Sequence, residues 1–140
     1  MITVIRISGK IGLRKPIEET LYRLRIRRKY SCIVLTNPTK EQLGMIQKVR
    51  DFVAFGEIKK EMFEKLIKSR GLPVNKTKKL DEPKKIISEL EKGKKYEELN
   101  LKPFFRLHSP RKGIKSKLHF PKGVLGNNKE KINELIERML

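Results

Sequence analysis

Hydrophobic side chains recur along this chain with two different periods, which predict where strands and helices lie. Residues 2–7 place apolar side chains at nearly alternate positions, as is typical of a strand. Ile17, Leu21 and Leu24 then follow at the spacing of one face of a helix. Residues 30–36 form an almost continuous apolar run, which indicates a central strand. The first quarter of the chain therefore predicts strand, helix, strand.

The next segment repeats the helix and the strand. Residues 39–42 match a capping box, in which Thr and Gln side chains satisfy free amides at a helix start. Leu43, Ile46 and Val49 supply the apolar face of that helix, and residues 53–58 read as a third strand. The order is βαβαβ, which predicts an α+β fold with a ferredoxin-like core. We expect a three-stranded sheet in residues 1–58, with its helices on one face and the other face free.

Residues 59–140 predict a mainly helical extension of this core. Apolar periodicity indicates helices over residues 60–70 and from Pro83 to about Gly93. Residues 104–107 are consistent with a short strand. Near the end, Asn128 is positioned to cap a final helix whose apolar face carries Ile132, Leu135, Ile136 and Met139.

Charge changes this picture more than any single motif does. The chain carries 35 Lys and Arg against 16 Asp and Glu, a formal net charge of +19. Between Glu98 and Glu130 it has no acidic residue, and this stretch holds both histidines and three prolines. A soluble surface normally mixes both signs, because like charges repel. We therefore predict a basic arm, about residues 102–129, whose partner is a polyanion, with nucleic acid favoured over an anionic membrane surface.

Catalytic and metal-binding patterns are missing from the sequence. It has no HExxH, CxxC or Walker-type phosphate loop. His108 and His119 lack the Cys or acidic neighbours of a metal site, so we interpret them as RNA-contacting groups rather than as ligands or general bases. The single cysteine, Cys32, lies in an apolar run and reads as a small buried hydrophobe. We expect no enzyme activity, no cofactor and no small-molecule substrate.

Two glycine features leave alternatives open. The segment from Gly9 to Gly12 is read as a plain loop, although its amides and Lys10 could meet a phosphate. Gly44 lies inside a predicted helix at a cost of about 1 kcal/mol relative to Ala. Either close packing within the protein or the proximity of RNA would explain it.

Several segments resemble the L-thirty family of large-subunit ribosomal proteins in its archaeal-type form. The core is similar to that family in residues 4–12, 20–28 and, most clearly, 43–52. The extension is similar in residues 101–113 and 130–136. The resemblance implies a non-enzymatic, cytoplasmic protein of the large ribosomal subunit that binds and stabilises folded ribosomal RNA. It also implies 5S RNA and neighbouring ribosomal proteins as further candidate partners.

The candidate RNA contacts come from the resemblance and from the basic pattern. The resemblance implies Arg6, Lys10, Arg14, Lys15, Arg27, Arg28, Gln47, Lys48, Arg50, Arg106, His108, Arg111 and Lys112; among these, only the resemblance points to Gln47. The basic pattern adds Arg23, Lys29, Lys102, Lys115, Lys117, His119 and Lys122. The rival hypothesis is a free-standing RNA-binding regulator. An enzyme acting on RNA is less favoured.

Overall fold

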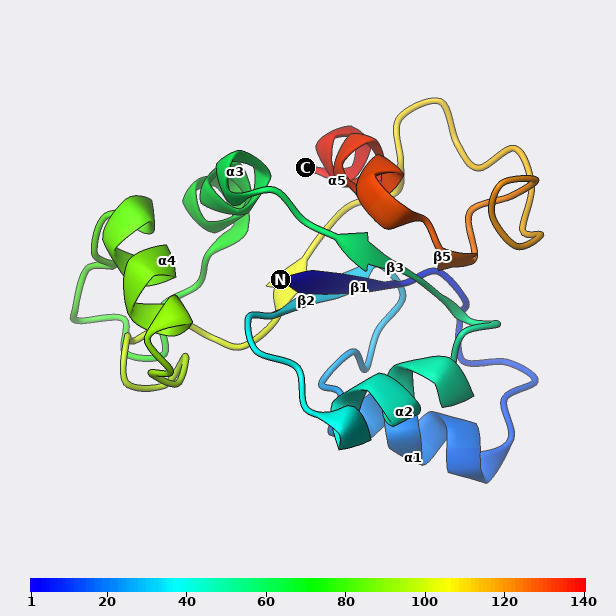
Figure 1. Ribbon diagram of the computed structural model, residues 1–140, viewed down its shortest axis with the longest axis horizontal. Coiled ribbons are helices and arrows are strands. Elements are labelled where there is room, and N and C mark those ends of the chain that lie inside the picture. Colours follow the sequence, from blue (N-terminus) through cyan, green and yellow to red (C-terminus); the bar gives the residue numbers. More distant parts are fainter.

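A computed structural model describes residues 1–140 as a mixed sheet covered by helices on both faces (Figure 1). The chain runs β1 (Ile2–Arg6), α1 (Lys15–Arg23), β2 (Ser31–Leu35), α2 (Lys40–Lys48) and β3 (Val53–Glu57). The extension adds α3 (Lys60–Arg70), α4 (Pro83–Glu91), β4 (Phe105–Arg106), β5 (Gly126–Asn127) and α5 (Ile132–Met139). A 3-10 turn, η1 (Lys129–Lys131), leads into α5. The α+β prediction and its βαβαβ core are confirmed.

The sheet has five strands in the order β4-β2-β1-β3-β5, with β1 at its centre. β1 is antiparallel to both β2 and β3, with Ile5 opposite Cys32 and Ala54. The two flanking strands are therefore parallel to each other, and α2 carries the chain across β1. The extension returns to the sheet twice, because β4 pairs with β2 and β5 pairs with β3. These short strands extend the predicted three-stranded sheet at both edges.

Local sequence explains where the core helices begin. Pro16 lies in the first turn of α1, where its missing N–H costs no helical hydrogen bond. The predicted capping box starts α2: the Gln42 amide donates to the Thr39 hydroxyl at 3.2 Å, and the Thr39 amide donates to the Gln42 side chain at 3.0 Å. The apolar residues of both helices then face β1–β3, where Val4, Leu21 and Ile46 belong to one buried cluster.

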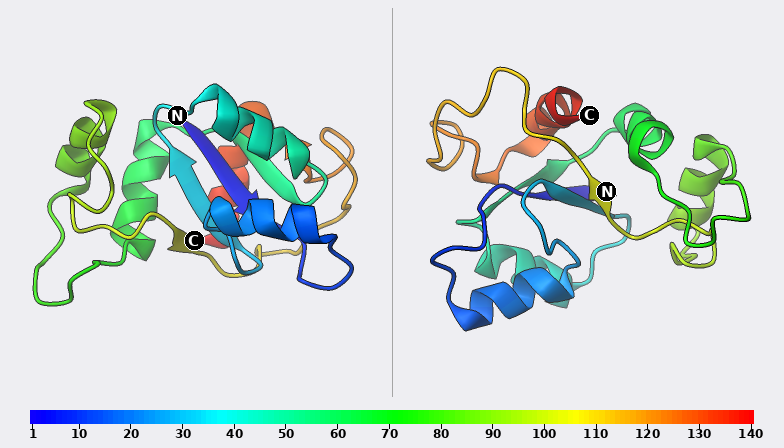
Figure 2. Two further views of the ribbon diagram at one scale, coloured as in Figure 1. Left: turned by 90° about the horizontal axis from the view of Figure 1, so that it is seen from below. Right: turned by 180° about the vertical axis from the view of Figure 1, so that it is seen from behind.

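The second face of the sheet is also buried, so the expectation that it stays free is wrong. Ile5 and Val34 point to this side and pack in a second cluster with residues of the extension, including Phe63 and Ile136. Figure 2 shows α3 and α5 on this face and α1 and α2 on the other. The predicted division into a core of residues 1–58 and an extension of residues 59–140 stays a prediction. In the structure both parts contribute strands to the same sheet and side chains to this second cluster.

Two asparagines attach the C-terminal helix to the sheet. Asn133 is buried, donates to the carbonyls of Glu57 and Glu130, and accepts from the Lys59 amide at 2.9 Å. Asn128 makes no side-chain cap, so its predicted capping role is wrong. The 3-10 turn moves the start of α5 to Ile132, four residues beyond Asn128. The Asn128 side chain donates instead to the carbonyls of Val124 at 2.7 Å and Gly126 at 3.1 Å, and its amide donates to the Phe55 carbonyl of β3 at 2.7 Å.

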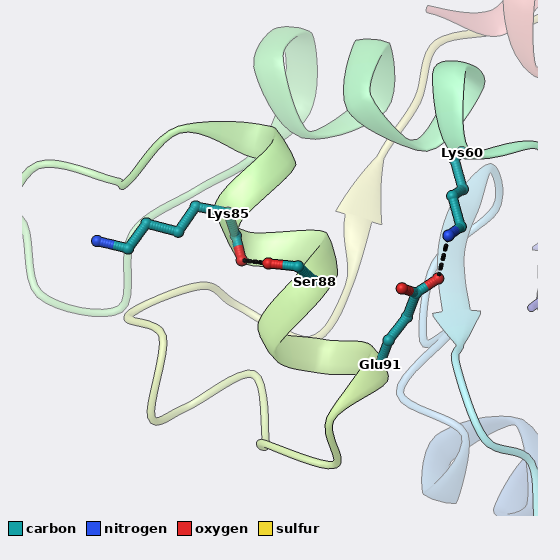
Figure 3. Close-up of polar contacts among 4 residues, drawn as sticks. All are labelled: Lys60, Lys85, Ser88 and Glu91. Atoms are coloured by element: carbon teal, nitrogen blue, oxygen red, sulfur yellow. Dashed lines mark hydrogen bonds and ion pairs between the residues drawn. The ribbon is translucent and has the colours of Figure 1, made fainter.

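The helix α4 lies beyond α3 and away from the sheet. An ion pair of 2.9 Å between Lys60 and Glu91 links the two helices, and Figure 3 shows this contact. In the same view, Ser88 bonds back to the carbonyl of Lys85, while the amine of Lys85 extends away from both helices. Ile86 and Leu90 face inward as predicted.

Gly56 provides a test of how the extension packs on β3. A Cβ there would lie 2.3 Å from the carbonyl oxygen of Lys129 and 3.0 Å from Ile132. Gly56→Ala should therefore lower the free energy of unfolding by about 1–3 kcal/mol, because the turn before α5 must move. Urea denaturation measures this change.

Gly44→Ala is the matched control. A Cβ at Gly44 meets nothing within 4 Å, and the residue is exposed inside α2. This variant should gain about 0.5–1 kcal/mol from helix propensity. Equal stability changes in the two variants would contradict the close contact at Gly56.

Candidate nucleic-acid interface

Four connections of the chain meet at one end of the sheet. β1 ends there, and the Ile7 amide donates to the Phe52 carbonyl at 3.1 Å. The Tyr30 amide donates to the Arg6 carbonyl at 2.7 Å, and the Leu107 amide donates to the Tyr30 carbonyl at 3.1 Å. We call this region, comprising residues 7–14, 24–30, 49–52 and 107–125, the loop end. It lies on the right in Figure 1, opposite α4.

Arg6 lies inside the loop end and is only 2 % exposed. Its guanidinium donates to four main-chain carbonyls, those of Ser8 at 3.0 Å, Gly9 at 3.2 Å, Ile26 at 3.0 Å and Arg27 at 2.8 Å. This geometry argues against the predicted contact of Arg6 with RNA, because its guanidinium is already bonded within the protein. The planar fork of an arginine suits it to tie two loops together, so Arg6 is a positioning residue.

The environment of Arg6 keeps the loops fixed without removing its charge. Burial lowers the pKa of Arg6 from its ordinary value, and the negative charge of Glu18 opposes that shift. An arginine starts so far above neutrality that the guanidinium stays protonated. Its charge therefore strengthens each hydrogen bond to a carbonyl.

The two loops that Arg6 joins, together with the two ends of α1 between them, carry most of the predicted contacts of the core. Lys10, Arg14, Lys15, Arg23, Arg27, Arg28 and Lys29 are all exposed. The Arg27 guanidinium lies over the ring of Tyr22, 3.9 Å from its centroid, and the Lys29 amine lies 5.0 Å from the ring of Tyr30. These cation–π contacts orient the side chains while leaving their charges unneutralised.

The end of α2 adds a third basic segment. Gln47, Lys48 and Arg50 are exposed in its last turn and in the following turn. Gly44, one turn earlier, has open space around its Cα, so close packing within the protein does not explain it. The proximity of RNA at Gly44 stays a prediction.

The first half of the arm is attached to α5 through main-chain atoms. The amide of His108 donates to the Met139 carbonyl at 3.1 Å, and that of Arg111 donates to the Arg138 carbonyl at 3.0 Å. The Arg138 guanidinium in turn donates to the carbonyls of Arg111 and Gly113. The sequence analysis did not identify Arg138, because a basic residue near the end of a helix carries no signal of the distant carbonyls to which it donates.

The second half of the arm folds back on itself before entering β5. The Val124 amide donates to the Ser116 carbonyl, and the Leu125 amide donates to the Leu118 carbonyl, both at 3.2 Å. The predicted cations of the arm all remain accessible: Lys102 is half-buried, and Arg106, Arg111, Lys112, Lys115, Lys117 and Lys122 are exposed. Figure 2 shows this segment looping outward beside α5.

The two histidines take part in contacts within the chain. Both ring nitrogens of His108 face main-chain oxygens, those of Ser109 and Leu140. This occupancy argues against the predicted hydrogen bond from His108 to RNA. His119 lies on the exposed arm, where its Nε2 is 2.7 Å from an Asp51 carboxylate oxygen, so it joins the arm to the turn after α2.

Most cations of the loop end have no acidic partner inside the protein. The Lys and Arg residues that form ion pairs are Arg25, Lys60, Lys65 and Lys94, and the remaining pair joins His119 and Asp51. None of the lysines or arginines predicted to contact RNA pairs with an acid. Most of the predicted cations, from three distant segments, are thus brought together without acidic partners. Lys102 is not among them, because its amide donates to the Leu72 carbonyl at 2.9 Å, beyond α3 and away from the loop end.

The remaining titratable groups with shifted pKa values lie outside the loop end: Cys32 is buried, Tyr96 is half-buried, and both contribute to packing. Cys32 is fully buried, as predicted, and burial raises the pKa of its thiol to about 12. Burial also raises the pKa of Tyr96, whose hydroxyl donates to the Val34 carbonyl. The structure holds no group of three or more His, Cys, Asp or Glu side chains arranged to bind a metal ion. Its helices are too short or too polar to cross a membrane.

Comparisons with known proteins give a consistent result. Residues 2–53 match the family model described as ribosomal protein L30p/L7e. The chain is 41 % identical to the large ribosomal subunit protein uL30 of Archaeoglobus fulgidus, with 99 % of both chains covered. It is 38 % identical to that of Nanoarchaeum equitans, over 98 % of this chain and 97 % of the relative.

The chain belongs to the uL30 family. The match covers the extension as well as the core, which confirms the archaeal-type resemblance. It also confirms the prediction that the chain is not an enzyme, because uL30 proteins are structural proteins of the ribosome.

Arg6→Lys tests the positioning role of the buried arginine in this uL30 protein. A lysine keeps the charge but cannot reach four carbonyls, and a hydrogen bond to a charged group contributes about 1.5–3 kcal/mol. The free energy of unfolding should fall by about 2–4 kcal/mol, and amides of residues 8–10 and 26–28 should exchange faster with solvent. Urea denaturation and hydrogen exchange measure these effects.

Lys10→Gln serves as the control in the adjacent loop. Its side chain is exposed and makes no ion pair, so the free energy of unfolding should stay within about 0.5 kcal/mol of the parent. Unchanged stability and exchange in Arg6→Lys would show that the guanidinium does not hold the loops.

Proposed function

We propose that this protein is a structural component of the large ribosomal subunit that binds and stabilises folded ribosomal RNA. The observation that supports the proposal most strongly is the loop end, where cations from the core and the arm lie together and where, among the lysines and arginines, only Arg25 has an acidic partner. The uL30 relatives carry the large ribosomal subunit in their name, and the match to this chain is nearly full-length. The protein would therefore act in the cytoplasm as part of the ribosome.

The proposed mechanism is electrostatic and geometric. Each Lys or Arg that approaches a phosphate releases condensed counterions, which favours binding at low salt. The fixed loops and the attached arm present these cations in a set arrangement, so less conformational entropy is lost on binding. RNA helices held against the loop end would repel each other less and would keep a defined orientation.

The proposed contacts are the predicted residues without Arg6 and His108. They comprise Lys10, Arg14, Lys15, Arg23, Arg27, Arg28, Lys29, Gln47, Lys48, Arg50, Lys102, Arg106, Arg111, Lys112, Lys115, Lys117, His119 and Lys122. The RNA partner is large-subunit ribosomal RNA, with 5S RNA and neighbouring ribosomal proteins as further proposed partners.

Sedimentation of cell extract tests the ribosomal assignment. In a sucrose gradient at low salt, the protein should migrate with assembled large subunits, because many phosphate contacts act together. Raising the salt concentration should release it. Immunodetection across the gradient measures the distribution. Recovery only in the slowly sedimenting fractions would favour a free-standing RNA-binding regulator instead.

The salt dependence of RNA binding tests the arm. Replacing Arg106, Arg111 and Lys112 with Ala should flatten the slope of log affinity against log salt by about two to three units, because up to three phosphate contacts are lost. Filter binding to in vitro transcribed large-subunit ribosomal RNA of Archaeoglobus fulgidus measures the slope.

The control removes the same charge from the opposite side of the molecule. Lys84, Lys85 and Lys92 are exposed on or beside α4 and form no ion pair. Figure 1 shows α4 on the side of the molecule opposite the loop end. Replacing them with Ala should leave the slope within about one unit of the parent. Equal flattening in both triple variants would mean that binding responds to net charge rather than to the arm.

A further inference from the structure

Ile11 stands out within the loop end because it is 99 % exposed. It lies between Gly9 and Gly12 at the tip of the loop that follows β1, which projects on the right in Figure 1. Gly12 has a φ of +79°, a conformation that L side chains rarely adopt, and open space surrounds the Cα of both glycines. The tip is therefore a sharp turn that presents a large aliphatic side chain to solvent.

The base of this loop is held firmly although its tip is free. The Ser8 amide donates to the Phe52 carbonyl at 3.1 Å, while Arg6 donates to the carbonyls of Ser8 and Gly9. A side chain on a fixed base loses less entropy when it binds than one on a mobile segment. The loop is thus built to project Ile11 in a defined direction.

Single exposed apolar residues are common, so the exposure of Ile11 needs comparison with the others. Tyr22 is exposed but lies against the guanidinium of Arg27. The remaining exposed aliphatic residues, Leu43, Leu72, Val74 and Leu118, are 39 %, 41 %, 51 % and 60 % exposed, so a large part of each is covered by the protein. Ile11 has no such cover and adds nothing to the folded core. The apolar surface of Ile11 can therefore contribute binding free energy only if another molecule covers it.

The neighbours of Ile11 indicate the chemistry of that contact. Lys10, Arg14 and Lys15 are exposed around it and form no ion pair. A partner with phosphate groups would pair with these cations. To cover Ile11 as well, the same partner needs an apolar surface next to its phosphates. Folded RNA provides both where a base is unpaired and unstacked.

We propose that Ile11 packs against an unpaired base of folded RNA, while the adjacent cations hold the flanking phosphates. This inference rests on the proposed function and specifies how one loop would read RNA shape. Burying an aliphatic side chain against a base releases no counterions, so this part of the binding free energy depends little on salt. Ile11 and Lys10 should therefore affect binding differently.

The test measures affinity and salt slope together for two substitutions in the same loop. Ile11→Ala should weaken binding to Archaeoglobus fulgidus large-subunit ribosomal RNA by about five- to thirty-fold, with an unchanged salt slope. Lys10→Gln should flatten the slope by about 0.7–0.9 units. Ile11→Leu, which keeps a large aliphatic side chain at this position, should retain most of the affinity of the parent protein. A regular RNA duplex, which exposes no unpaired base, should bind Ile11→Ala and the parent equally.

Val74→Ala is the matched control, because Val74 is 51 % exposed in the loop between α3 and α4 and away from the loop end. It should bind RNA like the parent. Thermal unfolding of Ile11→Ala should also match the parent, since the removed atoms contact nothing. If Ile11→Ala binds the ribosomal RNA like the parent, the inference is wrong while the proposed function stands.

Other outcomes separate the remaining possibilities. Unchanged RNA affinity with impaired recovery in large subunits would assign the Ile11 contact to a protein and overturn the contact with a base. Equal loss of affinity for the ribosomal RNA and the regular duplex would also overturn it. If the parent protein binds neither RNA, the proposed function itself fails.

Discussion

The structure depends on the burial of β1 on both of its faces. Thr3 to Ile7 are all buried, with Val4 on the side of α1 and α2 and Ile5 on the side of α3 and α5. A strand of this kind cannot leave one face in water, since exposing its aliphatic side chains would forfeit about 1.5–3 kcal/mol for each. The extension therefore has to pack on this second face of the sheet. As it crosses that face, it pairs with the two edges of the sheet through β4 and β5. This packing brings the arm to the same end as the loops of the core.

Arg6 shows how the same strand fixes the basic loops. It shares the face of Val4, where a charged group would normally be costly to bury. Four main-chain carbonyls, two from each loop, replace the water that the guanidinium loses. Because these carbonyls belong to separate segments, satisfying one arginine sets the relative position of both. The buried cation thereby orders the exposed cations around it without contacting a ligand itself.

Sequence periodicity predicted the helices and core strands well, because each depends on local spacing and capping. It also contained a signal for Arg6 that the family resemblance obscured: two residues after Val4, a strand side chain points to the same buried face. Other features were beyond sequence reasoning. The apolar stripe of α5 showed that Ile132 and Ile136 are buried, but not which face of the sheet they cover. The contacts of His108 with Leu140 and of Arg138 with Arg111 and Gly113 are set by tertiary packing across 25 or more positions.

The way the arm is held explains how a chain of such high positive charge can preserve a binding surface. Attachment through ion pairs would position the arm but would also consume cations. Apart from the contact between His119 and Asp51, the connections run to neutral main-chain oxygens: Arg138 bonds the carbonyls of Arg111 and Gly113, and Asn128 bonds that of Val124. Carbonyl acceptors fix geometry without cancelling charge. The mutual repulsion of the exposed lysines and arginines is then offset by apolar burial in the shared core, and their charge stays available to phosphates.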